Sequence, residues 1–206
     1  MPTIISNTPR MALVGELFKY QIRVEDLNEG ANLNYSLIKG PHGMQLDKSG
    51  KILWVPKAAQ INYNDFEVSV TDGYGTDIQS GKIFINNPPS IISTPKPVGL
   101  TGHTWRYKLT TEDLNGDRVT YRAVRLPKFA KFDRRLATIE WTPRKNQDGV
   151  NDFVLMAVDE HGATTTHDFQ VHVFYDPSAK QLVNSGWPLM LTFVGVVFAW
   201  GAGQMN

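Results

Sequence analysis

The stretch Pro2-Thr3-Ile4-Ile5-Ser6 returns in the middle of the chain as Pro89-Ser90-Ile91-Ile92-Ser93. From Pro2 to Pro89 the offset is 87 residues (89 − 2), and matched residues recur at nearly the same offset throughout both copies. Further matched pairs are Gly15 and Gly102, Tyr20 and Tyr107, Asp26 and Asp113, Asn28 and Asn115, Trp54 and Trp141, Pro56 and Pro143, and Asp72 and Asp159. A repeat of fixed period indicates two alike structural units, so this duplication decides the domain plan.

The repeat predicts a first module at residues 1–87 and a second at 88–176, followed by a linker at 177–187 and an apolar segment at 188–203. Modules of this size can bury a hydrophobic core of their own. The joint reads Asn86-Asn87-Pro88-Pro89, and its two prolines predict a short and stiff connection.

Both copies have the alternation that is typical of β-strands. Phe18, Tyr20 and Ile22 alternate with polar residues, which predicts a strand with one buried face. Turn signals such as Asp72-Gly73-Tyr74-Gly75 and Asn115-Gly116-Asp117 separate these runs. Short strands with turns at this spacing predict an all-β fold in which each module is an antiparallel β-sandwich.

The repeated residues resemble a known family. Its pattern in the first copy comprises Gly15, Tyr20, Asp26, Asn28, Tyr35, Pro41, Gly43, Met44, Ile52, Trp54, Pro56, Asp72, Gly73 and Gly75. These residues resemble the immunoglobulin-like, cadherin-like repeats of bacterial surface and dystroglycan-type proteins, and the resemblance covers residues 2–174. It implies two tandem Ig-like/cadherin-like sandwiches that adhere to partners or act as spacers. The second copy departs from the pattern at Pro127-Lys128-Phe129-Ala130, where the Gly-Met pair is lost.

Composition and motifs argue against several classes of function. The formal net charge is +1, which disfavours a dedicated nucleic-acid binder, and without cysteine no disulfide can form. The sequence contains no H-E-x-x-H, G-x-S-x-G or phosphate-binding glycine loop, and its five histidines form no catalytic pattern. Trp54 and Trp141 recur within the repeat, which favours a structural role over sugar stacking. We therefore expect a protein that is not an enzyme.

Calcium is the one metal that the resemblance brings into question, because family members sometimes hold it between modules. Asp113, Asn115 and Asp117 have a plausible alternating spacing for its oxygen ligands. The joint itself lacks acidic residues, and such Asp and Asn side chains also bond nearby backbone N–H groups in turns. We expect no bound metal and no other cofactor, and a fold that does not depend on calcium.

One strand of the second copy is apolar on both faces. Val154, Met156 and Val158 stand where the first copy has Glu67, Ser69 and Thr71. Contiguous exposed apolar surface marks a protein or membrane contact, so these three residues are candidates for partner binding. The alternative is that long side chains of neighbouring strands cover them.

A basic segment also distinguishes the second copy. Its cationic residues are Arg122, Arg125, Lys128, Lys131, Arg134 and Arg135. Each Lys or Arg near an anionic lipid surface contributes about 1 kcal/mol of attraction. The segment therefore predicts contact with lipid or with an acidic partner, the alternative being an ordinary solvated surface.

The end of the chain, from Gln181 to Asn206, has no charged side chain. Its apolar part predicts a C-terminal transmembrane helix at residues 188–203, with Trp187 and Trp200 near the two interfaces. Gly195 and Gly201 would allow another helix to approach closely. The alternative is a helix that packs back on the second module. Lys180 precedes the span and no basic residue follows it, which predicts single-pass anchoring in the inner membrane with cytoplasmic modules. A cleaved upstream signal would make the modules periplasmic.

Together these features favour a non-catalytic, single-span accessory or scaffold subunit of a large membrane complex, such as a photosynthetic or respiratory one. Its expected partners are protein subunits of that complex and the lipid bilayer. The alternative function is an outward-facing adhesion or ligand-binding module, either with or without calcium.

Overall fold

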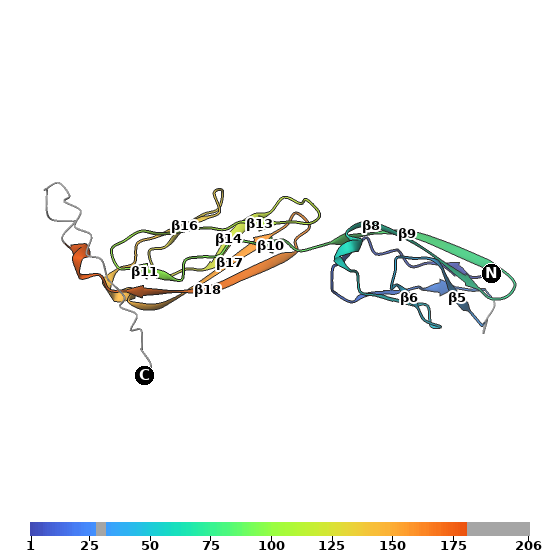
Figure 1. Ribbon diagram of the computed structural model, residues 1–206. Coiled ribbons are helices and arrows are strands. Elements are labelled where there is room, and N and C mark those ends of the chain that lie inside the picture. The colour runs from blue at the N-terminus through green and yellow to red at the C-terminus, as the bar shows by residue number, and fades with distance from the viewer. Residues whose placement is uncertain (28–31, 181–206) are drawn as a thin grey trace, which may run out of the picture.

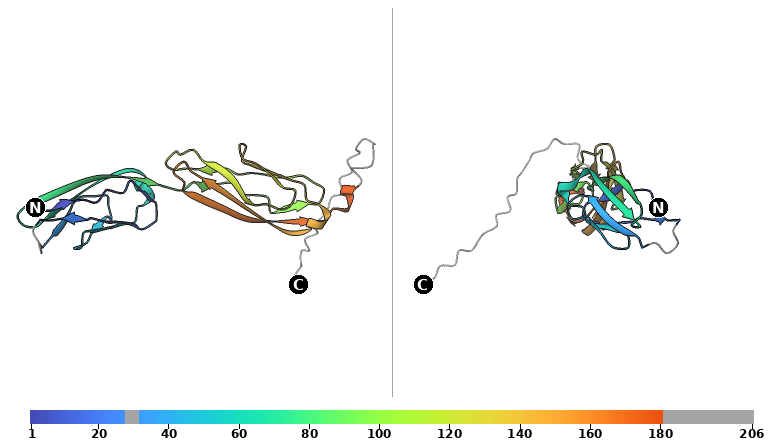
Figure 2. Two further views of the ribbon diagram at one scale, coloured as in Figure 1. Left: turned by 180° about the vertical axis from the view of Figure 1, so that it is seen from behind. Right: turned by 90° about the vertical axis from the view of Figure 1, so that its right-hand side faces the viewer.

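The computed structural model describes residues 1–27 and 32–180 of the 206-residue chain. Two β-sandwich modules lie end to end along one axis, with the joint between β9 and β10 (Figure 1; Figure 2). The helical structure within these ranges consists of three short 3-10 turns, at Ala58–Gln60, Lys145–Gln147 and Pro177–Lys180. The fold is therefore all-β, as the alternating pattern predicts.

In residues 1–27 and 32–87 the structure has nine strands in three sheets. They are β1 (Thr3–Ile4), β2 (Met11–Leu13), β3 (Phe18–Gln21), β4 (Val24–Glu25), β5 (Asn34–Lys39), β6 (Gln45–Leu46), β7 (Lys51–Trp54), β8 (Asn62–Thr71) and β9 (Thr76–Asn86). A four-stranded sheet in the order β2-β9-β8-β5 and a three-stranded sheet in the order β3-β7-β6 form the module together with the short β1-β4 ladder.

The second module repeats this plan strand for strand. Its strands are β10 (Ser90–Ile91), β11 (Val98–Leu100), β12 (Trp105–Lys108), β13 (Thr111–Glu112), β14 (Thr120–Arg125), β15 (Lys131–Asp133), β16 (Thr138–Trp141), β17 (Gly149–Val158) and β18 (Thr164–Phe174). The sheets have the orders β11-β18-β17-β14 and β12-β16-β15, and β10 pairs with β13.

One strand pair in each module differs from the antiparallel expectation. β2 runs parallel to β9, and β11 runs parallel to β18. The chain first pairs on one side, as β1 with β4, and then crosses to the edge of the four-stranded sheet. It therefore reaches that edge in the same direction as the last strand of the module.

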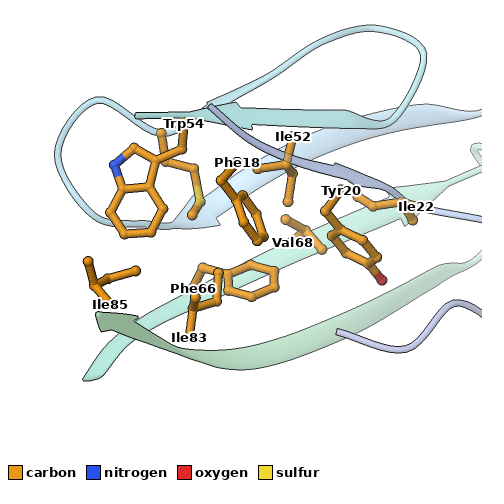
Figure 3. Close-up of a cluster of buried hydrophobic side chains, with 10 residues drawn as sticks. Phe18, Tyr20, Ile22, Ile52, Trp54, Phe66, Val68, Ile83 and Ile85 are labelled. Carbon is orange, nitrogen blue, oxygen red and sulfur yellow. The ribbon is translucent and has the colours of Figure 1, made fainter. Parts of the chain in front are cut away.

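Each module has its own aromatic core, as its size allows. In the first module Trp54 is 1% exposed and packs edge-on against Phe18, within a cluster that includes Phe66 and Ile52 (Figure 3). Trp141 is equally buried in the second module. The repeated tryptophans are therefore structural, as predicted, because buried aromatic side chains contribute large apolar areas to a core.

The two copies have different residues at three positions with a left-handed backbone, and one of these lies in the loop before β15. Gly43 has a φ of 86°, and Phe129 takes its place in the second module with a φ of 69°. Left-handed φ is readily adopted by glycine and is an outlier for a bulky residue. The second module therefore keeps the left-handed backbone conformation although the Gly-Met pair is lost, and a phenylalanine must adopt it in place of a glycine.

The expectations for the tail lie outside the described residues. They concern the transmembrane helix at 188–203 together with Trp187, Gly195, Trp200 and Gly201. Within residues 1–27 and 32–180, no helix has the length and apolar character needed to cross a membrane.

Candidate docking face and inter-module junction

The outer face of the four-stranded sheet in the second module contains part of the basic segment and an apolar strip, which we define as Val154, Met156 and Val158. Val154, Met156 and Val158 lie on the outward side of β17 and are half-buried, whereas Leu155 between them is fully buried. On the neighbouring strand β14, Arg122 lies directly opposite Met156. Its guanidinium nitrogens Nε and Nη2 lie 3.1 and 2.8 Å from the Met156 sulfur.

The contact between Arg122 and Met156 covers the apolar residues of β17 only in part. Arginine side chains can lay their aliphatic stems on apolar surface while the charged end stays in water. Arg122 covers part of the strip in this way, yet the three outward residues remain partly exposed. The strip is thus an apolar surface with an arginine across it rather than a fully covered one.

A cationic pocket adjoins the same strip. Arg118, Arg122, Arg134 and Arg135 line a pocket of about 630 Å³ together with Val158. Arg118 belongs to the loop before β14, and Arg134 and Arg135 belong to the turn between β15 and β16. In the part of the chain that the structure describes, no carboxylate lies within 4.0 Å of these four guanidinium groups. The pocket therefore concentrates positive charge without internal neutralisation.

The rest of the predicted basic segment does not belong to this pocket. Arg125 lies 3.8 Å from the Asp152 carboxylate, so it has an acidic partner within the sheet. Lys128 is in the loop before β15, and Lys131 lines a different pocket at the far end of the module. The run of cations divides in space because it passes from β14 through a loop, β15 and a turn. Sequence reasoning missed Arg118, since only the fold brings its loop beside the turn at Arg134.

At the junction, Asn115 connects the two modules. Its Oδ1 accepts a hydrogen bond from the backbone N–H of Asn87 at 2.7 Å. Its Nδ2 donates to the Ile85 carbonyl at 2.9 Å and to the Asn62 side chain at 3.2 Å. The rings of Phe84 and His161 also meet across the junction, with centroids 4.6 Å apart. Asn115 is therefore a structural clamp, and its oxygen is already in use.

Three carboxylates converge beside this clamp. Oxygens of Asp113, Asp117 and Asp159 lie within 4.8 Å of one another. The Oδ2 atoms of Asp113 and Asp117 are buried and have no hydrogen-bond partner among the described residues. Asp159 accepts from the buried Asn86 amide at 2.7 Å, and the Oδ1 of that same Asn86 is also without a partner in the described ranges. Of the candidate calcium ligands Asp113, Asn115 and Asp117, the two aspartates thus belong to this group, and Asp159 takes the place of Asn115.

The electrostatics of this cluster favour positive charge. The side chain of Asp117 is 8% exposed, and its burial raises the pKa of its carboxyl, with the neighbouring Asp113 carboxylate adding to the rise. His161 lies 3.7 Å away and opposes the rise. Asp117, Glu160 and His161 also form a compact group.

The cluster has the chemistry of a hard-cation site. Calcium prefers six to eight oxygen ligands, and carboxylate and amide oxygens are the side-chain groups that suit it. Asp113, Asp117 and Asp159 would hold the ion, with the unpaired Oδ1 of Asn86 close by. The sequence signal for Asp159 was its position in a repeated turn, which by itself indicates backbone capping.

Each of the two copies matches a known protein family separately. A family model described as "Putative Ig domain" matches residues 2–85 and again residues 88–174. A search of curated proteins finds no match.

Solved structures give similarities of low identity. The titin I-band fragment I67-I69 is 12% identical with a TM-score of 0.48, over 84% of this chain and 66% of that one. Sidekick-1 immunoglobulin domains 1-4 are 12% identical to this chain with a TM-score of 0.47, and the match covers 84% of this chain and 48% of that one. The endo-fucoidan hydrolase MfFcnA4 from glycoside hydrolase family 107 is 20% identical with a TM-score of 0.37, and this chain spans 29% of its length. With two family matches that together cover most of its length, the chain belongs to the Putative Ig domain family.

Proposed function

We propose that the chain is a non-catalytic scaffold whose second module docks an acidic protein partner. The observation that carries this proposal is the single face on which Arg122 lies across Met156 beside the four-arginine pocket. Aromatic, methionine and arginine side chains are enriched in protein interfaces, whereas scattered surface charge is not. Arginine also presents a planar fork of donors that matches a carboxylate.

The duplication supports the proposal because the first module serves as an internal control. At the positions of Val154, Met156 and Val158 the first module has Glu67, Ser69 and Thr71. At the positions of Arg122 and Arg135 it has Ser36 and Ser49. The same fold forms with either set, so the sandwich itself does not require an apolar, arginine-rich face.

The junction gives the scaffold its second property. The Asn115 clamp and the Phe84–His161 contact hold one module against the other, so the docking face would sit at a set distance from the first module. We further propose that the partner is a subunit of a large membrane complex. In this proposal the segment 188–203 spans the bilayer and the two modules are cytoplasmic. The uncharged sequence of that segment supports this form.

The test replaces the face with the residues of the first module. The triple variant Val154→Glu, Met156→Ser, Val158→Thr leaves the inward residues of β17 unchanged, so the melting temperature should stay close to that of the wild type. Recovery of the chain in its native assembly should fall at least tenfold, because a glutamate buried without a partner is costly. The matched control Glu67→Val, Ser69→Met, Thr71→Val alters the first module and should leave recovery unchanged. Unchanged recovery of the first variant would contradict the proposal.

A second candidate function is calcium-dependent adhesion. The specific observation in its favour is the group formed by Asp113, Asp117 and Asp159 at the junction, with buried oxygens that lack partners among the described residues. A cation there would connect the two modules and align them for contact with an outside ligand. Isothermal titration of the chelator-treated full chain with calcium tests this candidate, and the absence of binding at millimolar calcium would exclude it.

A further inference from the structure

The end of the second module that lies opposite the junction contains a pocket of about 510 Å³. Its wall is built by the turn after β11, by β15 with the loop before it, by β16 with the turn that follows, and by the chain after β18. Ligand pockets commonly have volumes of 300–1,000 Å³, so this one is large enough for a sugar-sized molecule. It shares none of its residues with the docking face or the junction cluster.

The charged residues of the pocket divide into two groups. The acidic ones are already paired: Glu140 lies 3.0 Å from Arg106, and Asp176 lies 2.7 Å from His103. The basic ones, Lys131, Arg144 and Lys145, have no carboxylate within 4.0 Å in residues 1–27 and 32–180. The free charge that remains in the pocket is therefore positive.

Two of these cations are held against aromatic rings. The Arg144 guanidinium carbon lies 3.5 Å from the ring centroid of Phe129, and the Lys145 amine lies 5.0 Å from that of Tyr175. Both rings line the pocket, and they are 50% and 41% exposed. A guanidinium stacked on a ring is fixed in orientation while its planar fork of donors stays available to an oxyanion.

Phe129 occupies its place at a conformational cost. Its φ of 69° is the left-handed conformation that Gly43 supplies in the first module. Strain of this kind persists where the surrounding structure maintains it, and it clusters at ligand sites. An exposed phenylalanine contributes little to the core, so packing does not account for this residue.

Tyr175 is held in place by the residue that follows it. The Asp176 backbone N–H donates to Thr101 Oγ1 at 2.9 Å, and the Asp176 carboxylate accepts from the Ser178 hydroxyl at 2.6 Å. The Ser178 and His103 hydrogen bonds lower the pKa of Asp176, so this carboxylate is charged and anchored at neutral pH. The wall that contains Tyr175 is thereby preorganised.

The first module lacks every one of these features at the matching positions. Phe129, Lys131, Lys145 and Tyr175 correspond to Gly43, Gln45, Ala58 and Asn87. Lys57 takes the place of Arg144, without the phenylalanine beneath it. The pocket is therefore an addition to the second copy that the shared fold does not require.

We infer that this pocket binds an acidic saccharide, with Arg144 and Lys131 on its anionic group and with Phe129 and Tyr175 against its ring. A carboxylate or another oxyanion matches the unpaired cations. The exposed Thr142 hydroxyl provides a partner for a sugar hydroxyl, and the aromatic surfaces suit the apolar face of a pyranose. A free inorganic anion would satisfy the cations and leave the aromatic walls without a role.

The experiment is a titration of the full chain with an oligogalacturonate hexamer, using maltohexaose as the neutral probe and inorganic phosphate as the simple anion. We expect saturable binding of the acidic hexamer that is at least tenfold tighter than binding of either control probe. Arg144→Glu should abolish it. The matched variant Lys57→Glu makes a reversal of charge at the equivalent position of the first module and should leave it unchanged.

The variant Phe129→Gly separates binding from folding. It restores the residue that the first module uses at this φ, so the melting temperature should hold or rise while the affinity for the hexamer falls at least fivefold. Equal binding by wild type and Arg144→Glu would overturn the inference, as would equal affinity for maltohexaose. Binding to vesicles that contain phosphatidylglycerol, without binding to the hexamer, would assign the pocket to a lipid headgroup and would also overturn it.

Discussion

The amide of Asn86 donates a hydrogen bond of 2.7 Å to the carboxylate of Asp159, and both side chains are buried. Asn86 is the last residue of the first module's final strand, whereas Asp159 follows β17 of the second module. The bond therefore crosses the joint, close to the Asn115 clamp and the Phe84–His161 contact. Buried polar groups need partners to avoid a large desolvation penalty, so this arrangement favours one relative placement of the modules.

The first prediction concerns the rigidity of the joint. Asn115→Ala removes the hydrogen bonds to Asn87, Ile85 and Asn62, and at about 0.5–1.5 kcal/mol for each of the three bonds it should weaken the junction by about 1.5–4.5 kcal/mol. We expect a wider distribution of inter-module angles, measured by small-angle X-ray scattering, with each module still folded. Asn146→Ala, an exposed change in the second module, is the control. A scattering profile identical to that of the wild type would show that the clamp is not what aligns the modules.

The second prediction concerns Asp117 and calcium. The pKa of Asp117 is raised above 3.8 in the folded chain, so between the two values the native state binds more protons than the unfolded state. The stability that this group contributes is full below pH about 3.8 and is lost as the pH rises through its folded pKa. In chelator, Asp117→Asn should therefore raise the melting temperature at pH 7.

A bound cation should reverse this penalty in the wild type. If calcium occupies the cluster, millimolar calcium should raise the wild-type melting temperature by several degrees through mass action, and the variant should lose that response. Superimposable wild-type melting curves in calcium and in chelator would exclude the calcium-dependent alternative. They would agree with the expectation from the sequence that the fold does not depend on calcium.

The third prediction uses His167, whose Nε2 is buried without a partner among the described residues. Burial lowers the pKa of His167 below 6.5, although the neighbouring Asp168 opposes the shift. A histidine with a depressed folded pKa contributes stability that is present above pH about 6.5 and is lost as the pH falls through the folded value. The second module should therefore lose stability on acidification below that pH.

The equivalent residue of the first module, Gln79, provides the matched variants. It accepts from the Tyr20 hydroxyl at 2.7 Å and donates to the Ser6 carbonyl at 2.6 Å without titrating. His167→Gln should flatten the acid dependence of the second module's melting temperature, and Gln79→His should introduce one in the first. Parallel pH profiles for wild type and His167→Gln would disprove the role given to this histidine.

The fourth prediction concerns the tail. An arginine in the middle of a transmembrane helix costs about 2.5–3.5 kcal/mol on insertion scales. If residues 188–203 span a bilayer, Val196→Arg should move the chain from the carbonate-resistant membrane fraction into the soluble fraction, and Val196→Leu should not. Retention of the arginine variant in the membrane would argue against a spanning tail.

The sequence predicted the architecture well because the duplication and the alternating strands report directly on the fold. Each repeated tryptophan is buried, and the turn signals at Asp72 and Asn115 lie between β8 and β9 and between β13 and β14. The parallel pairing of β2 with β9 was not predictable, since the alternation of a strand says nothing of which edge it reaches. The predicted antiparallel pairing holds for the other strand pairs of the described residues, and the β2-β9 and β11-β18 pairs are parallel.

The sites were harder to predict because they form between segments that are distant in sequence. Arg118 meets Arg134 only through the fold, and Asp159 joins Asp113 only at the junction. The spacing of Asp113, Asn115 and Asp117 suggested one ligand set, and the structure uses Asn115 for a different purpose. Comparing the two copies residue by residue was the most informative signal, since it separates what the fold requires from what the second module has added.

The most direct test of the docking face is site-specific photo-crosslinking in the native assembly. A benzophenone amino acid at Val158 lies beside the arginine pocket, and the same amino acid at Thr71 lies at the equivalent position of the first module. The account predicts one dominant adduct from position 158, mapped by mass spectrometry to an acidic segment of a partner protein, with none from position 71. Equal yields from the two positions, or an adduct at 158 with a segment that has no acidic residues, would contradict the claim that this face docks an acidic partner.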